Sequence, residues 1–158
     1  MLNTIVWATD GSENAARSLS SARALLPEGA MLIAVHIVPE SAGHHADGAG
    51  GTHPDPPDVV ASLWKLVAEV SEDGVNVALR IADYIGPQPA KGIADIAREV
   101  GADVIVVGTR GHSPIAGVLV GSVTQSLLQI APCPVLAVLP PPEPTRDVGD
   151  MDVVRAAG

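Results

Sequence analysis

The sequence predicts an α/β fold, a doubly wound five-stranded parallel sheet with helices on both faces. Short apolar runs alternate with helical periods along the 158 residues, which is the pattern of repeated β-α units. The runs are nearly continuous in Val, Ile and Leu, as is typical of parallel strands buried on both faces. Hydrophobic residues make up 47% and charged residues 17% of the chain, so a buried core is expected and a disordered chain is excluded.

The first half of the chain predicts two strands and two helices. Residues 5–8 (IVWA) and 31–38 (MLIAVHIV) are short apolar runs that we interpret as buried strands. Ser12 is a suitable N-cap for the first helix, and Pro27-Glu28-Gly29 ends it. The spacing of one helix face is kept first by Ala15, Leu19, Ala22 and Leu26, and then by Val60, Leu63, Val67 and Val70.

The second half continues the alternation. Residues 75–82 alternate apolar and polar side chains, which favours a strand near a sheet edge. Ile93, Ile96, Ala97 and Val100 indicate a third helix, which Gly101 ends. The remaining elements are expected to be a strand over 104–107, a helix over 121–130 and a strand over 135–138.

Composition divides the chain into one domain and two irregular segments. We expect a single α/β domain over residues 1–139. Residues 39–58 are rich in Gly, Pro, His and Asp, and they are expected to form an exposed, flexible loop within it. Residues 140–158 open with a proline cluster and are expected to be a disordered tail.

Several partners and compartments are disfavoured. The net charge of −9 argues against nucleic acid and anionic membranes, and an aromatic content of 2% leaves almost no side chains for stacking on bases. The start of the chain lacks a basic, signal-like segment, and no run of about 18 apolar residues occurs. A cytoplasmic protein is therefore expected. Cys133 is the only cysteine, so an intrachain disulfide is excluded.

Two strand ends carry residues suited to binding an anion. The first strand runs into Asp10-Gly11-Ser12, and the fourth runs into a segment that contains Gly108, Gly111 and Gly121-Ser122. Glycine lets the backbone approach a ligand closely, and the N–H groups of a following helix attract phosphate. The alternative is that these glycines only serve the turns of an ordinary strand-to-helix loop.

With Asp10, Gly108-x-x-Gly111-x9-Gly121-Ser122 and a closing Pro134-Val-Leu-Ala-Val, the chain resembles the universal stress protein family. The resemblance covers residues 3–139 and is to the nucleotide-binding branch of that family. It implies the strand order 3-2-1-4-5 and a homodimer that pairs through its last strand. In this chain that strand contains Val135, Leu136, Ala137 and Val138.

The resemblance also implies a ligand, which is ATP or another adenine nucleotide, with or without magnesium. Asp10 would lie near the ribose or a bound magnesium ion, Ile37 would meet adenine through its backbone, and the glycines would surround the phosphates. The full set of implied contacts is Ala8, Thr9, Asp10, Ile37, Val107, Gly108, Arg110, Gly111, Gly121, Ser122 and Val123.

One departure from the family pattern concerns charge. Members that hold a triphosphate often carry a basic residue in the nine-residue spacer, whereas residues 112–120 (HSPIAGVLV) contain neither Lys nor Arg. A triphosphate would then depend on backbone N–H groups and metal. AMP, a cyclic nucleotide or an empty site therefore remain alternatives.

Catalysis is not indicated by the sequence. No nucleophile–base pair with an orienting third residue is recognisable, and the P-loop ending in Gly-Lys-Ser/Thr is absent. We therefore expect a nucleotide-binding stress-response or regulatory module. A slow ATPase or autophosphorylating protein and an interaction protein with a vestigial site are the alternatives. His36, inside an apolar strand, is expected to be a hydrogen-bonded core histidine.

Overall fold

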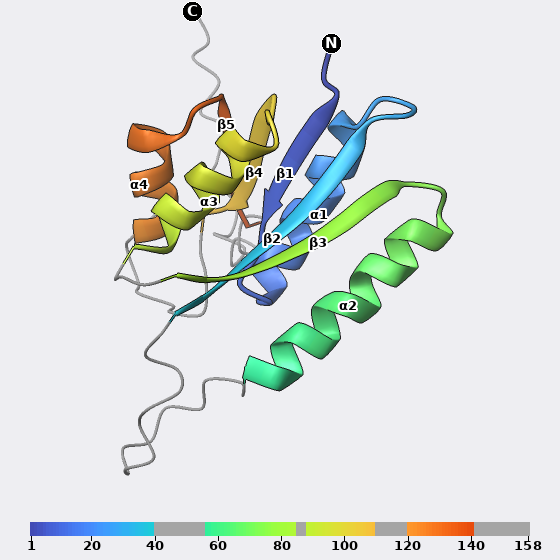
Figure 1. The fold of residues 1–158 in the computed structure, drawn as a ribbon, viewed down its shortest axis with the longest axis horizontal. Coiled ribbons are helices and arrows are strands. Elements are labelled where there is room, and N and C mark those ends of the chain that lie inside the picture. Colours follow the sequence, from blue (N-terminus) through green and yellow to red (C-terminus); the bar gives the residue numbers. More distant parts are fainter. Residues whose placement is uncertain (40–55, 85–87, 110–119, 141–158) are drawn as a thin grey trace, which may run out of the picture.

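Five parallel strands form one sheet in the order β3-β2-β1-β4-β5 (Figure 1). The computed structural model describes residues 1–39, 56–84, 88–109 and 120–140. The fold class and the strand order expected from the sequence are both confirmed. The strands are β1 (Thr4–Ala8), β2 (Met31–Pro39), β3 (Asn76–Tyr84), β4 (Val104–Gly108) and β5 (Val135–Val138).

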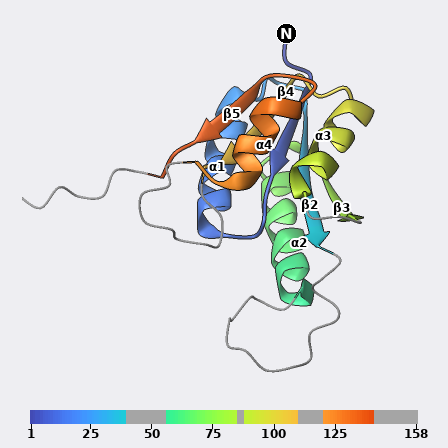
Figure 2. The same cartoon turned by 90° about the vertical axis from the view of Figure 1, so that its left-hand side faces the viewer.

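In the described residues, four helices cover the sheet, two on each face (Figure 1). They are α1 (Glu13–Leu25), α2 (Pro56–Glu72), α3 (Pro89–Glu99) and α4 (Ser122–Ile130). Leu19 of α1 and Val67 of α2 belong to one buried cluster, while Ile93 of α3 and Leu127 of α4 belong to the other. Figure 2 looks at the molecule from the side of α3 and α4. Because side chains alternate along a strand, successive residues of the same strand lie in different cores.

The core is mostly aliphatic, with one large exception. Trp7 on β1 is 1% exposed and is among the largest fully buried side chains. Its indole N–H lies 2.9 Å from Ser18 Oγ and 3.1 Å from the Ala15 carbonyl oxygen, so α1 satisfies its polar group. Trp7 belongs to the run over residues 5–8 that the sequence predicts as a buried strand.

The segment expected as a loop over residues 39–58 differs from that expectation at both ends. Pro39 is the last residue of β2, and Pro56 begins α2, three residues earlier than expected. Proline is tolerated at both places because a helix start needs no N–H donor there and a strand end loses only one ladder bond. Residues 40–55, and the expected tail from 141 onward, lie outside the described residues.

The amino ends of β1 and β4 are joined by a carboxylate. Asp103 Oδ2 accepts the backbone N–H groups of Asn3 at 2.7 Å and of Thr4 at 2.9 Å. These two bonds hold the pKa of Asp103 below its ordinary value, and the Asn3 bond has the larger effect. In the described parts of the chain, no helix is both long enough and apolar enough to cross a membrane.

Candidate functional site

The carboxyl ends of three central strands meet at one edge of the sheet. Ala8, the last residue of β1, pairs with Val35 on β2 and with Val107 on β4. Ile37 lies two residues beyond Val35, and all four side chains are buried. Each helix begins at this edge because the strands are parallel and each of β1 to β4 is followed by a helix that returns the chain. In open α/β sheets, ligands bind outside such strand ends.

The turn after β1 is held by its own side chains. The Gly11 N–H donates to Thr9 Oγ1 at 3.1 Å, and the Ser12 N–H donates to Asp10 Oδ1 at 2.9 Å. Gly11 adopts a φ of +80°, which favours glycine because a Cβ is strained in the left-handed region. Asp10 is therefore oriented by the turn that follows it, at the end of a buried strand.

The end of β4 is fastened to the first turn of α4. The Thr109 N–H continues the β4–β5 ladder by donating to the Val138 carbonyl at 2.9 Å. The Thr109 carbonyl then accepts the Gly121 N–H at 2.6 Å. The Thr124 hydroxyl donates to the Gly108 carbonyl at 2.9 Å. These bonds place the start of α4 directly against the carboxyl end of β4.

Gly121 is the N-cap of α4, and no side chain of the described residues caps the first turn of this helix. It has no side chain to cap the first-turn N–H groups, unlike Ser12, whose hydroxyl accepts the Ala15 N–H at the start of α1. A Cβ at Gly121 would lie 3.2 Å from the Thr109 carbonyl oxygen. Backbone donors and the positive end of the helix dipole then face this edge, which suits an anion such as phosphate.

Thr109 carries a buried hydroxyl that has no hydrogen-bond partner among the described residues. The residue is 1% exposed, and its place in the alternation of β4 puts it on the same face as Ile105, Val107 and α4. Buried hydroxyls are nearly always paired, so this one marks a place where a partner is missing. Thr109 is not among the contacts expected from the sequence, although a polar residue directly after the apolar β4 strand, at the start of the glycine segment, is a signal for it.

His36 is buried on β2, and its Nδ1 lies 2.9 Å from the Thr9 carbonyl oxygen. A hydrogen-bonded core histidine was the expectation, and the structure confirms it. The contact also joins β2 to the first residue after β1, which the sequence alone did not indicate.

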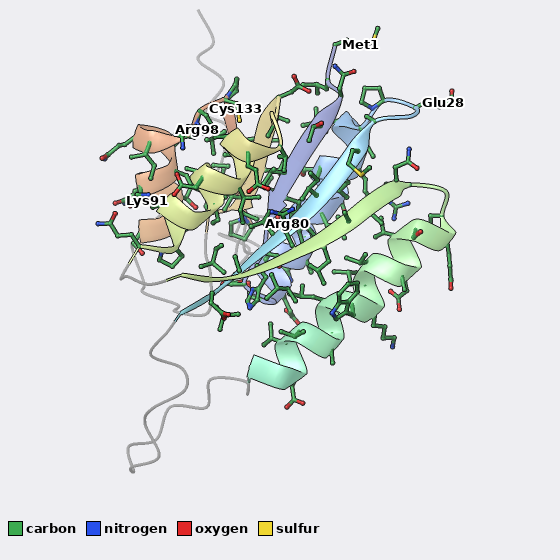
Figure 3. The ribbon with its side chains drawn as sticks, in the orientation of Figure 1. Met1, Glu28, Arg80, Lys91, Arg98 and Cys133 are labelled. Carbon is green, nitrogen blue, oxygen red and sulfur yellow. The ribbon has the colours of Figure 1, made fainter. Side chains whose placement is uncertain are left out.

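Positive side chains contribute little to this edge. Figure 3 shows Arg80 on β3 and Lys91 and Arg98 on α3, and each of them binds a carboxylate. The same holds for every other Lys and Arg in the described ranges, which are Arg17, Arg23 and Lys65. Among the described residues, positive potential at the site therefore comes from helix ends and backbone N–H groups.

Cys133 lies away from this edge. It directly precedes Pro134 and β5, at the amino end of that strand (Figure 3). Burial, and secondarily the Asp103 carboxylate, raise the pKa of the Cys133 thiol. A raised pKa keeps the thiol protonated and weakly reactive, so Cys133 is not part of the candidate site.

The structure brings together nine of the eleven residues predicted for the site. They are Ala8, Thr9, Asp10, Ile37, Val107, Gly108, Gly121, Ser122 and Val123, at the ends of β1, β2 and β4 and the start of α4. Arg110 and Gly111 lie outside the described residues.

Comparison with known proteins supports one family. The model of the universal stress protein family matches residues 1–138. A universal stress protein of Thermus aquaticus, from the region 3′ of a QAH/OAS sulfhydrylase, is 33% identical over 144 residues, which cover 87% of this chain and 99% of that protein.

Two solved structures of similar proteins contain nucleotides. A universal stress protein in complex with cAMP is 25% identical, with a TM-score of 0.59 over 87% of this chain and 97% of that one. The universal stress protein of Archaeoglobus fulgidus in complex with dAMP is 26% identical, with a TM-score of 0.58 over 87% of this chain and 97% of that one.

Proposed function

The chain belongs to the universal stress protein family, and from that premise we propose that it binds an adenine nucleotide at the carboxyl edge of its sheet. The observation that carries the proposal is the start of α4. There the uncapped first turn and the Cβ-free Gly121 lie beside the end of β4. A phosphate fits this arrangement because it needs backbone donors and close approach. Similar proteins bound to cAMP and dAMP support an adenine nucleotide.

Each end of the nucleotide has proposed contacts. The phosphate would be held by the backbone of Gly121, Ser122 and Val123. The nucleoside would lie across the end of β1, with Asp10 near the ribose and Ile37 against the base. Asp10 is also the carboxylate that would hold magnesium if a di- or triphosphate were bound, since Mg²⁺ takes one or two carboxylates together with phosphate oxygens.

We further propose that nucleotides with one phosphate bind at least as well as ATP. The Lys and Arg residues of the described ranges are already paired with carboxylates. Near the site, Arg17 is paired with Glu13 in the first turns of α1, so this pair adds no net positive charge to a chain of net charge −9. A triphosphate would therefore meet repulsion that a monophosphate or cyclic nucleotide largely avoids.

The proposal is tested by identifying the small molecule released when gently purified protein is denatured, followed by calorimetric titration of AMP, cAMP and ATP, with and without magnesium. Micromolar binding of any of these would support the site. A protein that is empty and takes up none of them would contradict it. If ADP accumulates when ATP is supplied, and does not accumulate with Asp10→Ala, the same site also hydrolyses ATP slowly.

A matched pair of variants locates the phosphate. Gly121→Asp puts a carboxylate where the phosphate should approach, so affinity should fall at least tenfold, about 1.4 kcal/mol. Gly29→Asp makes the same chemical change in the turn before β2, where a Cβ meets no atom within 4 Å. Equal affinity of the two variants would place the phosphate elsewhere.

We also propose that the protein forms a homodimer through β5. This strand is at one edge of the sheet, and Leu136 on it is 37% exposed. Leu139 just after β5, together with Leu128 and Ile130 of α4, adds further exposed apolar surface. An exposed apolar strand edge is a template for pairing, and a second copy of the chain offers a matching edge.

A further inference from the structure

The hydrogen-bond ladder between β1 and β2 reaches the candidate site at Thr9. The Thr9 N–H donates to the Val35 carbonyl at 2.9 Å, so Val35 turns its main-chain groups toward β1. Alternate residues of a strand face the same neighbour, so Ile37 turns its N–H toward β1 as well. In a continued parallel ladder the next bond would run from the Ile37 N–H to the Thr9 carbonyl.

His36 takes that carbonyl instead. Its Nδ1 lies 2.9 Å from the Thr9 oxygen. A carbonyl oxygen only accepts, so this Nδ1 carries the hydrogen and donates it. No backbone bond joins Ile37 to Thr9 among the described residues. The ladder therefore ends one step early, with a side chain in place of a main-chain donor.

The Ile37 N–H is consequently directed toward the end of β1 without a main-chain acceptor among the described residues. Ile37 is 7% exposed, and a backbone N–H in such surroundings needs an acceptor. The edge of an adenine ring offers unprotonated ring nitrogens as acceptors, next to an amino donor.

We propose that His36 is a positioning residue for the base. Its Nδ1–H binds the Thr9 carbonyl at the point where the Ile37 N–H would continue the ladder, and this leaves the Ile37 N–H for an adenine edge. This role rests on the proposed nucleotide site. A leucine at this position would leave the Thr9 carbonyl without its donor, and the Ile37 N–H would take its place in the ladder.

The first experiment needs no nucleotide. Hydrogen exchange of the Ile37 amide, followed by NMR, should be at least about tenfold slower in His36→Leu than in the parent, because a ladder bond protects an amide. His36→Asn should exchange like the parent, since the Asn Nδ2 occupies the position of the histidine Nδ1. Equal protection of Ile37 in the parent and in His36→Leu would overturn the proposal.

The second experiment separates the base from the phosphate. His36→Leu should weaken AMP binding about tenfold, the effect of roughly one hydrogen bond, and leave the binding of ribose 5-phosphate unchanged in an NMR titration. His36→Asn should restore AMP affinity. A merely structural role would weaken both ligands alike, and that result would overturn the proposal.

The two experiments separate failure of His36 from failure of the site. A parent protein that binds neither AMP nor ribose 5-phosphate refutes the proposed function, while the exchange rate of Ile37 still decides whether His36 ends the ladder. If His36→Leu does not fold, His36→Asn is compared with His36→Gln, whose longer side chain moves the amide away from the Nδ1 position. Equal behaviour of these two variants would also overturn the proposal.

Discussion

Thr109 and Thr124 are both buried at the start of α4, yet among the described residues only the Thr124 hydroxyl has a hydrogen-bond partner. Thr109→Val replaces an unpaired hydroxyl by a methyl group of the same shape and should raise the free energy of unfolding by about 1 kcal/mol. Thr124→Val removes the donor to the Gly108 carbonyl and should lower it by about 1–2 kcal/mol. Urea unfolding of both variants checks the opposite signs. A loss of stability in Thr109→Val would show that its hydroxyl is satisfied in solution.

A second residue-scale prediction concerns Gly11 and Gly29, which share a φ near +80° but differ in surroundings. A Cβ on Gly11 would lie 2.7 Å from Val59 Cγ1 of α2, whereas a Cβ on Gly29 meets nothing within 4 Å. Gly29→Ala should destabilise by about 1 kcal/mol, from backbone strain alone. Gly11→Ala should cost about 1–3 kcal/mol more, from overpacking. An equal decrease in melting temperature for the two variants would mean that α2 moves away from the new Cβ without a loss of stability.

At the scale of elements, Asp103 couples the amino ends of β1 and β4, and it makes the fold acid-sensitive. Its pKa is lower in the folded chain than the ordinary value of 3.8, because the Asn3 and Thr4 N–H groups bind the carboxylate. The unfolded chain therefore binds more protons, so this contribution is complete above the ordinary pKa and is lost as the pH falls through the folded pKa. Urea midpoints measured between pH 6 and pH 2 should fall less steeply for Asp103→Asn. Identical slopes for the two proteins would contradict this.

Most elements could be predicted because their signals are local. The spacing of Ala15, Leu19 and Ala22 predicts the buried face of α1, and Ser12 does act as its N-cap. The apolar run over 104–107 likewise marks the buried part of β4. The ends of the expected 39–58 loop are wrong because the composition of a segment does not mark its exact ends: Pro39 is the last residue of β2 and Pro56 the first of α2.

The finer contacts of the candidate site could not be predicted because they depend on tertiary pairing. No local pattern shows that His36 reaches the carbonyl of Thr9, which is 27 residues away in the chain. The unpaired hydroxyl of Thr109 is likewise visible only once α4 is packed against β4. Nucleotide contacts such as that of Asp10 were implied by family resemblance and remain predictions.

At the scale of the whole molecule, the two edges of the sheet should behave differently. Leu136 on β5 and Ile81 on β3 are both 37% exposed and belong to opposite edge strands. Leu136→Glu should convert the proposed dimer into a monomer, because two carboxylates would face each other across the interface. Ile81→Glu is the control and should leave the molecular mass of the dimer in solution unchanged. Sedimentation equilibrium checks both, and a dimer that survives Leu136→Glu would refute pairing through β5.

The two tryptophans of the chain lie in opposite surroundings, and this makes the protein its own optical probe. Trp7 is buried in the core and is 1% exposed, whereas Trp64 on α2 is 54% exposed. With no Phe and one Tyr, these two indoles dominate near-ultraviolet absorption and emission. Iodide should quench Trp64 selectively, and a Trp64→Phe variant should emit at short wavelength from Trp7 alone. A red shift of this Trp7 emission would then report the opening of the core between α1 and the sheet.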